Sequence, residues 1–128
     1  MNFEKIIFGF FITLAATLNF GFTIGNIGDP QLHNVWELAA AIVVSLIATV
    51  LKFGDRTQLG AVHLATSLVA DLQLISAGVV WTLYSQVIGA DPLSPHQMAT
   101  VVSLSAGALV ANSISVVLMI SESVMLRR

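Results

Sequence analysis

The chain has 128 residues, of which 56% are hydrophobic and 9% are charged, and its mean hydropathy is +0.90. Soluble domains carry roughly 25% charged residues, so this chain has too few polar side chains to cover a surface in water. A net charge of −2 excludes a basic nucleic-acid interface, and the lack of cysteine excludes disulfides and cysteine metal sites. The composition therefore predicts an all-α integral membrane protein.

Four membrane spans fit the length of the chain. A spanning helix needs about 20 apolar residues, and we expect four such helices at about residues 3–24, 35–53, 57–88 and 95–125. These spans leave only short turns, so residues 1–128 are expected to form a single transmembrane domain. Consecutive spans joined by short turns predict a bundle of two helix hairpins.

Capping patterns indicate where two of the helices begin. Asn34 and Glu37 have the spacing of a capping box, in which each side chain accepts a hydrogen bond from the other residue's backbone N–H. Ser94 and Gln97 repeat this spacing, with Pro95 at the first helical position. We therefore expect the second and fourth spans to begin at these residues.

The third span is the longest of the predicted helices. It begins near Asp55 or Thr57, since Asp55 and Gln58 also have capping-box spacing. It runs for about 30 residues, or about 45 Å at the rise of an α-helix, before the Gly-Ala-Asp-Pro sequence at 89–92 breaks it. Because this length exceeds the hydrocarbon core, we expect the helix to tilt or to protrude.

The cationic residues predict the orientation. In a four-span chain all five of them fall on one side: Lys5, Lys52, Arg56, Arg127 and Arg128. Positively charged residues stay in the cytoplasm, so both termini are expected there. Trp36, Trp81 and Tyr84 then fall near the opposite interface, where aromatic side chains are enriched.

The two predicted outer turns resemble each other. Residues 27–30 and 88–92 both combine Ile-Gly with Asp-Pro, and each is followed by a capping residue. Two hairpins in the same orientation would be related by an axis along the membrane normal, as in transporters with parallel repeats. The pattern is also compatible with turn chemistry alone, because Asp and Pro are common in turns.

Asp71 is the only charged residue expected near the middle of the membrane. Placing it there costs about 2.5–3.5 kcal/mol on insertion scales, so the third span should face a partner or a hydrated cavity. Two interpretations are open. Asp71 is a cation or proton site, or it makes a structural hydrogen bond to an amide or hydroxyl on another helix.

His63, Ser67 and Asp71 recur every four residues and therefore share one helix face. His63 lies near the cytoplasmic end, so this face is a candidate relay for protons or ions between the membrane centre and the cytoplasm. The other interpretation is that His63 is an interfacial residue that reaches lipid headgroups.

Three amide side chains also lie deep in the predicted spans: Asn19, Gln73 and Asn112. We place them along the same ion pathway, and either asparagine is a candidate hydrogen-bond partner of Asp71 in the same or a neighbouring protomer. Interhelical polar bonds in membranes average about 0.6 kcal/mol, so helix packing is the alternative role.

Small residues at four-residue spacing predict close helix packing. The stripes are Gly9, Thr13, Thr17, Gly21 and Gly25 in the first span, and Ala99, Ser103, Gly107, Ala111 and Ser115 in the fourth. Such stripes let backbones approach where no hydrophobic effect drives association. Two of them in four helices favour a homo-oligomer, and a serine-lined pore is the less favoured interpretation.

Motifs typical of enzymes are missing from the sequence, which has no H-E-x-x-H, no G-x-S-x-G and no pair of carboxylates in one span. We therefore expect a protein that is not an enzyme and that uses no cofactor and no metal. The acidic and histidine residues of the outer side are attributed to turn and capping chemistry: Asp29, His33, Glu37, Asp91 and His96.

The preferred hypothesis is a small oligomeric protein of the bacterial cytoplasmic membrane that forms or contributes to a cation or proton pathway, with Asp71 as the polar site in the membrane. The alternative is a non-catalytic accessory or scaffold subunit of a larger membrane complex. In that case Asp71 would be an assembly contact with the partner.

Overall fold

The computed structural model describes residues 3–24, 35–54, 57–90 and 93–126. In this part of the chain all regular structure is helical: α1 (Phe3–Thr23), α2 (Val35–Lys52), α3 (Gln58–Thr82), the π-helical turn η2 (Leu83–Val87) and α4 (Pro95–Leu126). Four helices are long and apolar enough to cross a membrane, the third of them comprising α3 and η2. The prediction of an all-helical chain with four span-length helices is confirmed.

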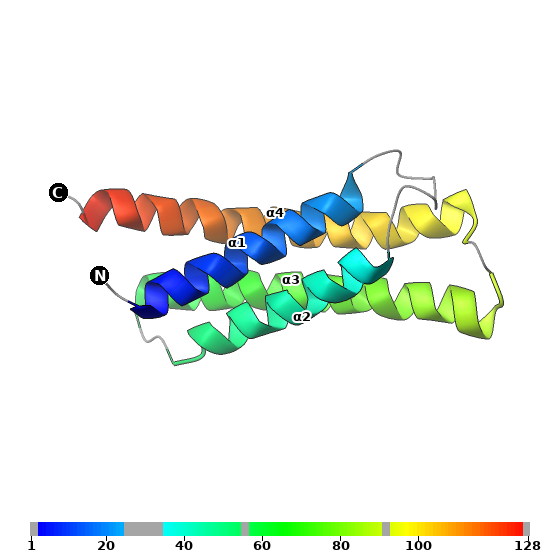
Figure 1. The fold of residues 1–128 in the computed structure, drawn as a ribbon, viewed down its shortest axis with the longest axis horizontal. Helices are drawn as coiled ribbons and strands as arrows, with labels where there is room; N and C mark the ends of the chain where they lie inside the picture. The colour runs from blue at the N-terminus through cyan, green and yellow to red at the C-terminus, as the bar shows by residue number, and fades with distance from the viewer. Residues whose placement is uncertain (1–2, 25–34, 55–56, 91–92, 127–128) are drawn as a thin grey trace.

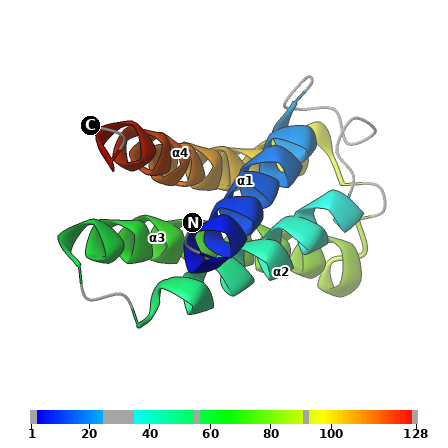
Figure 2. The ribbon, with the colours of Figure 1, turned by 60° about the vertical axis from the view of Figure 1, so that its left-hand side comes forward.

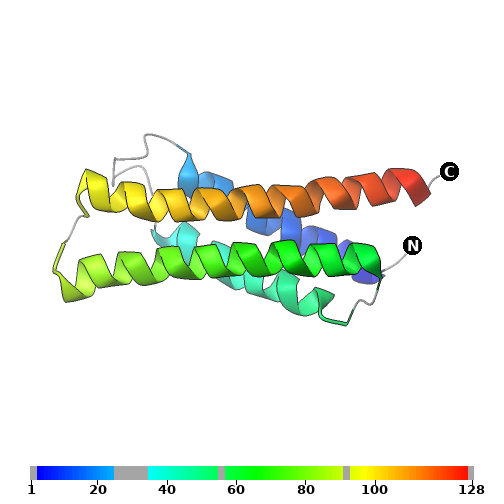
Figure 3. The same ribbon diagram turned by 180° about the vertical axis from the view of Figure 1, so that it is seen from behind.

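The four helices run alternately up and down the bundle (Figure 1). Each packs mainly on its neighbours in chain order, and α4 closes the ring against α1. Figure 3 shows α3 and α4 side by side along their length, whereas Figure 2 shows α1 inclined across the bundle. As a result, α1 begins and α4 ends at the same end of the molecule (Figure 1).

Side-chain caps fix two helix starts. Ser94 and Gln97 form a capping box, in which the Ser94 N–H donates to Gln97 Oε1 at 2.9 Å and the Gln97 N–H donates to Ser94 Oγ at 3.2 Å. Of the two caps considered for the third span, Thr57 caps α3, accepting from the Gly60 N–H at 2.9 Å. Asn34 and Asp55 lie outside the described residues.

The interior divides into two halves of different chemistry. We call residues 3–13, 44–54, 57–72 and 111–126 the terminal half, and residues 14–24, 35–43, 73–90 and 93–110 the distal half. Eleven of the sixteen buried hydrophobic side chains of the described chain lie in the distal half, whereas eight of its ten buried polar or charged side chains lie in the terminal half. The polar eight are Ser45, Thr49, Lys52, His63, Ser67, Asp71, Asn112 and Ser115.

The outside of the bundle is apolar over the middle of the helices. Large hydrophobic side chains are exposed on every helix, among them Phe10, Val50, Leu72, Val110 and Val117. Contiguous apolar surface of this kind is rare on soluble monomers and is typical of surfaces that contact membrane or protein.

Candidate functional site

Asp71 is 7% exposed, and its carboxyl group lies between α3 and α2. Ser45 Oγ donates to Asp71 Oδ1 at 2.7 Å, and Thr49 Oγ1 donates to Asp71 Oδ2. Ser45 and Thr49 are four residues apart, so one face of α2 presents both hydroxyl groups. Both carboxyl oxygens therefore have a partner within the chain, and the carboxyl group is held between two hydroxyls.

The two asparagines considered as partners of Asp71 do not bond to it within this chain. Both are fully buried, and neither their Oδ1 nor their Nδ2 atoms have a hydrogen-bond partner in the described part of the chain. The hydroxyls of Ser45 and Thr49 take that place. Sequence reasoning missed them, although their four-residue spacing in α2 mirrors that of Ser67 and Asp71 in α3.

His63 and Ser67 lie on the buried face of α3 together with Asp71, at 2% and 0% exposure. The Phe8 ring of α1 meets the His63 ring edge to face, with centroids 5.0 Å apart. The Lys52 ammonium of α2 lies 4.3 Å from the centroid of the same Phe8 ring, which is cation–π geometry. A lysine, an aromatic ring and a histidine thus lie together in the terminal half, on the side of Asp71 nearer the chain ends.

Several buried polar atoms lack a partner in the described chain. They are Ser67 Oγ, Gln73 Oε1 and both amide atoms of Asn19 and of Asn112. An unmet buried donor or acceptor costs about 1–3 kcal/mol. Such groups in native proteins are typically met by water or a ligand, so this interior is suited to bind small polar species.

The register of α3 against α4 fixes the level of Asn112 along the bundle. Thr66 and Ser115 share a hydroxyl–hydroxyl hydrogen bond, and the Gln73 side chain packs so closely on Gly107 that a Cβ there would clash with it. Asn112 lies between Gly107 and Ser115 in α4, so it lies opposite the turn of α3 that connects Ser67 with Asp71.

The small-residue stripes divide between the interior and the surface. Three glycines pack closely against side chains of other helices: Gly9 against the Met119 sulfur, Gly21 against the Glu37 carboxylate and Gly107 against the Gln73 amide. Ala111 and Ser115 are buried and Ala99 is half-buried, whereas Thr13, Thr17 and Ser103 are exposed. A four-residue step turns about 40° around the helix axis, so a stripe of five cannot face one neighbour throughout. Gly25 lies outside the described residues.

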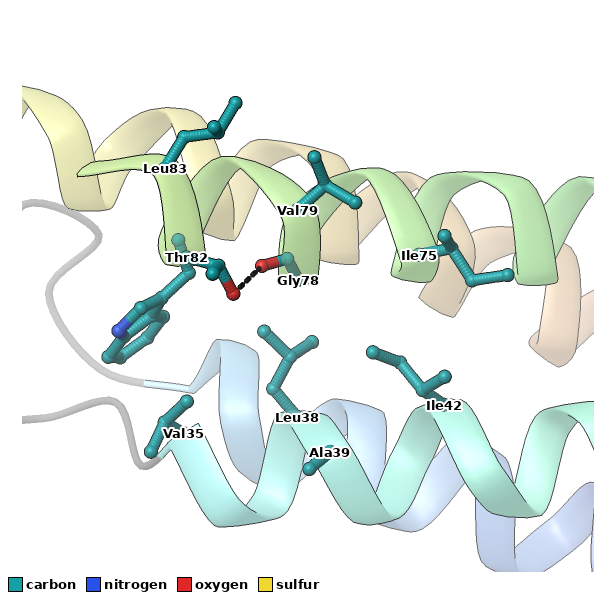
Figure 4. Close-up of a pocket in the computed structure, with 10 residues that line it drawn as sticks. Val35, Leu38, Ala39, Ile42, Ile75, Gly78, Val79, Thr82 and Leu83 are labelled. Carbon is teal, nitrogen blue, oxygen red and sulfur yellow. Dashed lines mark hydrogen bonds between the residues drawn. The ribbon is translucent and has the colours of Figure 1, made fainter. Parts of the chain in front are cut away.

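The distal half has an open groove instead of a polar site. Between α2 and α3, a groove of about 480 Å³ is lined by apolar side chains including Leu38, Ile42, Ile75 and Val79 (Figure 4). The Thr82 hydroxyl at this groove donates to the Gly78 carbonyl in its own helix at 2.9 Å. Most of the buried polar side chains of the described chain therefore lie in the terminal half, which contains Asp71.

Comparison with known proteins places the chain in a family. No curated protein and no solved structure matches it. Residues 32–123 match the profile of a family of unknown function (DUF6394), and the matched part includes α2, α3 and most of α4 and so contains Ser45, Thr49 and Asp71. Since the match covers well over half of the sequence, the chain belongs to this family of unknown function (DUF6394).

Proposed function

We propose that this chain is an integral membrane protein of the bacterial cytoplasmic membrane that crosses it four times, with both termini in the cytoplasm. The apolar exposed faces of the helices support insertion. The cytoplasmic orientation is supported by the charge distribution, because every Lys and Arg falls at a chain end or near the α2–α3 turn. The parallel repeat of the two hairpins stays a prediction.

Within the membrane, the bundle provides a pathway for a cation or proton, with Asp71 as its central site. The observation that carries this proposal is the concentration of buried polar groups around Asp71 in the interior of a single bundle. Ionisable groups inside membranes are costly and are found on ion and proton pathways. His63 and Ser67 continue the pathway toward the terminal end, and Gln73 and Asn19 lie along it toward the distal end.

The accessory-subunit function is supported by small residues on the outside of the bundle. Thr13, Thr17 and Ser103 belong to small-residue stripes but face outward, and small exposed residues allow another helix to approach closely. This favours a homo-oligomer or a larger membrane partner. Asp71 itself is a weak candidate for that contact, because it is buried and bonds to hydroxyls of its own chain.

The ion pathway is tested by flux measurements on purified protein in liposomes. The wild-type protein should pass a cation or protons, and Asp71→Asn should abolish the flux while leaving the oligomer intact. Ser76→Ala is the matched control on the same helix, because the Ser76 hydroxyl donates to the Leu72 carbonyl of its own helix at 2.7 Å. A wild-type protein that passes no ion contradicts the pathway, and loss of a co-purifying chain in Asp71→Asn supports the accessory function instead.

The orientation is tested separately with single cysteines, which the cysteine-free sequence makes possible. In intact cells, Ala90→Cys should react with a thiol reagent that does not cross membranes, and Gly54→Cys should not. Gly54 tolerates this change because a Cβ at that position meets nothing within 4 Å. The opposite labelling pattern contradicts the orientation.

A further inference from the structure

We propose that the ion handled at Asp71 is the proton, and that water bound by Ser67 and Asn112 delivers it from the terminal end of the bundle. This inference rests on the ion pathway proposed above and names the ion that uses it.

The unpartnered atoms include donors as well as acceptors. Asn112 and Asn19 each offer an oxygen acceptor and an NH₂ donor, and both atoms of each amide lack a partner in the described residues. A metal cation would bind only the oxygens and would leave both NH₂ groups unmet. Water donates and accepts hydrogen bonds, so it satisfies both ends of the amide. The interior therefore matches water better than a bare metal ion.

The position of these atoms leads to Asp71. Ser67 lies one helical turn from Asp71 on the same face of α3, about 6 Å along the axis, and its unpartnered Oγ is fully buried. Asn112 on α4 lies opposite that turn, as the Thr66–Ser115 and Gln73–Gly107 contacts require. Water held between Ser67 and Asn112 would thus lie within about one helical turn of the carboxyl group.

The hydroxyls around Asp71 suit a group that gains and loses a proton. When a hydronium ion in the water chain gives up a proton, one of its O–H bonds breaks and a new O–H bond forms on an Asp71 oxygen. Ser45 and Thr49 donate to the carboxylate. Since a hydroxyl rotates and also accepts, either one receives the hydrogen bond of the protonated acid without a change in helix packing.

The charged and titratable groups nearest this site come from two of the four helices. In the terminal half of the described chain, α2 contributes Lys52 and α3 contributes His63 as buried groups of this kind. At that level α1 contributes Phe8 and α4 contributes Asn112 and Ser115, which are neutral. The local balance of charge is therefore set by Asp71, Lys52 and His63.

Water should enter from the terminal end. The distal half is packed mainly with the apolar cluster that includes Phe22, Leu38, Leu74 and Met98, all of them 0–1% exposed. Apolar interiors hold little water, so we expect hydration there only around Asn19 and Gln73. Most of the buried polar side chains lie on the other side of Asp71, toward Lys52 and His63.

The ion is identified by measuring proton, sodium and rubidium flux in the same liposomes. We expect proton flux through the wild-type protein, its loss in Asp71→Asn, its retention in Asp71→Glu, and no sodium or rubidium flux that depends on Asp71. Asp71-dependent sodium or rubidium flux would overturn this inference and leave the proposed ion pathway standing. If none of the three ions moves, both the inference and the pathway are wrong.

Hydration is measured independently with single cysteines on α3. Ser67→Cys and Ala77→Cys are both at fully buried positions of one helix, in the terminal and distal halves respectively. A thiosulfonate reagent applied from the terminal side reacts with thiolates, which form only where water reaches. We expect Ser67→Cys to be modified while Ala77→Cys stays unmodified, with both variants unfolding cooperatively at the wild-type temperature. Equal protection of the two cysteines overturns the water pathway.

Discussion

In the distal half, Phe22, Leu38 and Leu74 fill the space between the helices and are no more than 1% exposed. In the terminal half the interior contains Ser67 and Asn112, both at 0% exposure, and Asp71 at 7%. The distal interior gains its stability from close apolar packing. The terminal interior gains less, because most of its buried side chains are polar and a hydrogen bond contributes only about 1 kcal/mol net.

This difference indicates that the two halves of the bundle have different roles. Apolar packing in the distal half fixes the helices relative to one another, and that frame holds Asp71 against Ser45 and Thr49. Polar groups that contribute little to stability are retained where a function uses them. Substitutions in the distal half should therefore mainly reduce stability, whereas substitutions in the terminal half should mainly reduce transport.

The largest expected effect on stability is in the distal half. Leu74→Ala removes a fully buried side chain from the apolar cluster and leaves a cavity, which should cost about 2–5 kcal/mol. Ser67→Ala, on the same helix, removes only a hydroxyl that has no partner in the described chain and leaves no large cavity, so it should cost less than Leu74→Ala. Unfolding by denaturant in detergent micelles measures both. A larger loss for Ser67→Ala would break the comparison.

An intermediate effect is expected where the terminal half has a satisfied polar contact. Thr49→Val keeps the shape of the side chain but removes the hydroxyl that donates to Asp71 Oδ2, which should cost about 1–3 kcal/mol. In an Asp71→Leu background the same substitution should cost much less, because the acceptor is gone. This double-mutant cycle isolates the hydroxyl–carboxyl contact, and additive effects would show that Thr49 acts by packing alone.

The parts of the structure that the sequence predicts are those set by local pattern. The helices follow from apolar runs, and the Ser94–Gln97 capping box follows from its spacing. The shared burial of His63, Ser67 and Asp71 follows from a four-residue repeat over two turns, which drifts little around the axis.

The parts that escape prediction depend on how the helices meet. Ser45 and Thr49 sit in an apolar run of α2 and look unremarkable in sequence, because small hydroxyl side chains are common in membrane helices. Their role depends on the antiparallel register that brings them opposite Asp71. Helix packing also decides the positions of Thr13 and Thr17. They share a stripe with Gly9 and Gly21 but face outward.

The smallest expected effect is at the rim of the terminal half, where the Lys5 ammonium lies 3.3 Å from a Glu122 carboxylate oxygen and joins the start of α1 to the end of α4. The side chains are 46% and 27% exposed, so solvent and salt screen the pair. Exposed ion pairs contribute about 0–1 kcal/mol, and Lys5→Gln should therefore change the free energy of unfolding by less than Thr49→Val does. Unfolding measured at low and high salt tests this, because the effect of Lys5→Gln should shrink at high salt.

Glu122→Gln is the matched control and should give the same small loss. A loss as large as that of Leu74→Ala would mean that the rim, and not the distal core, holds α1 against α4.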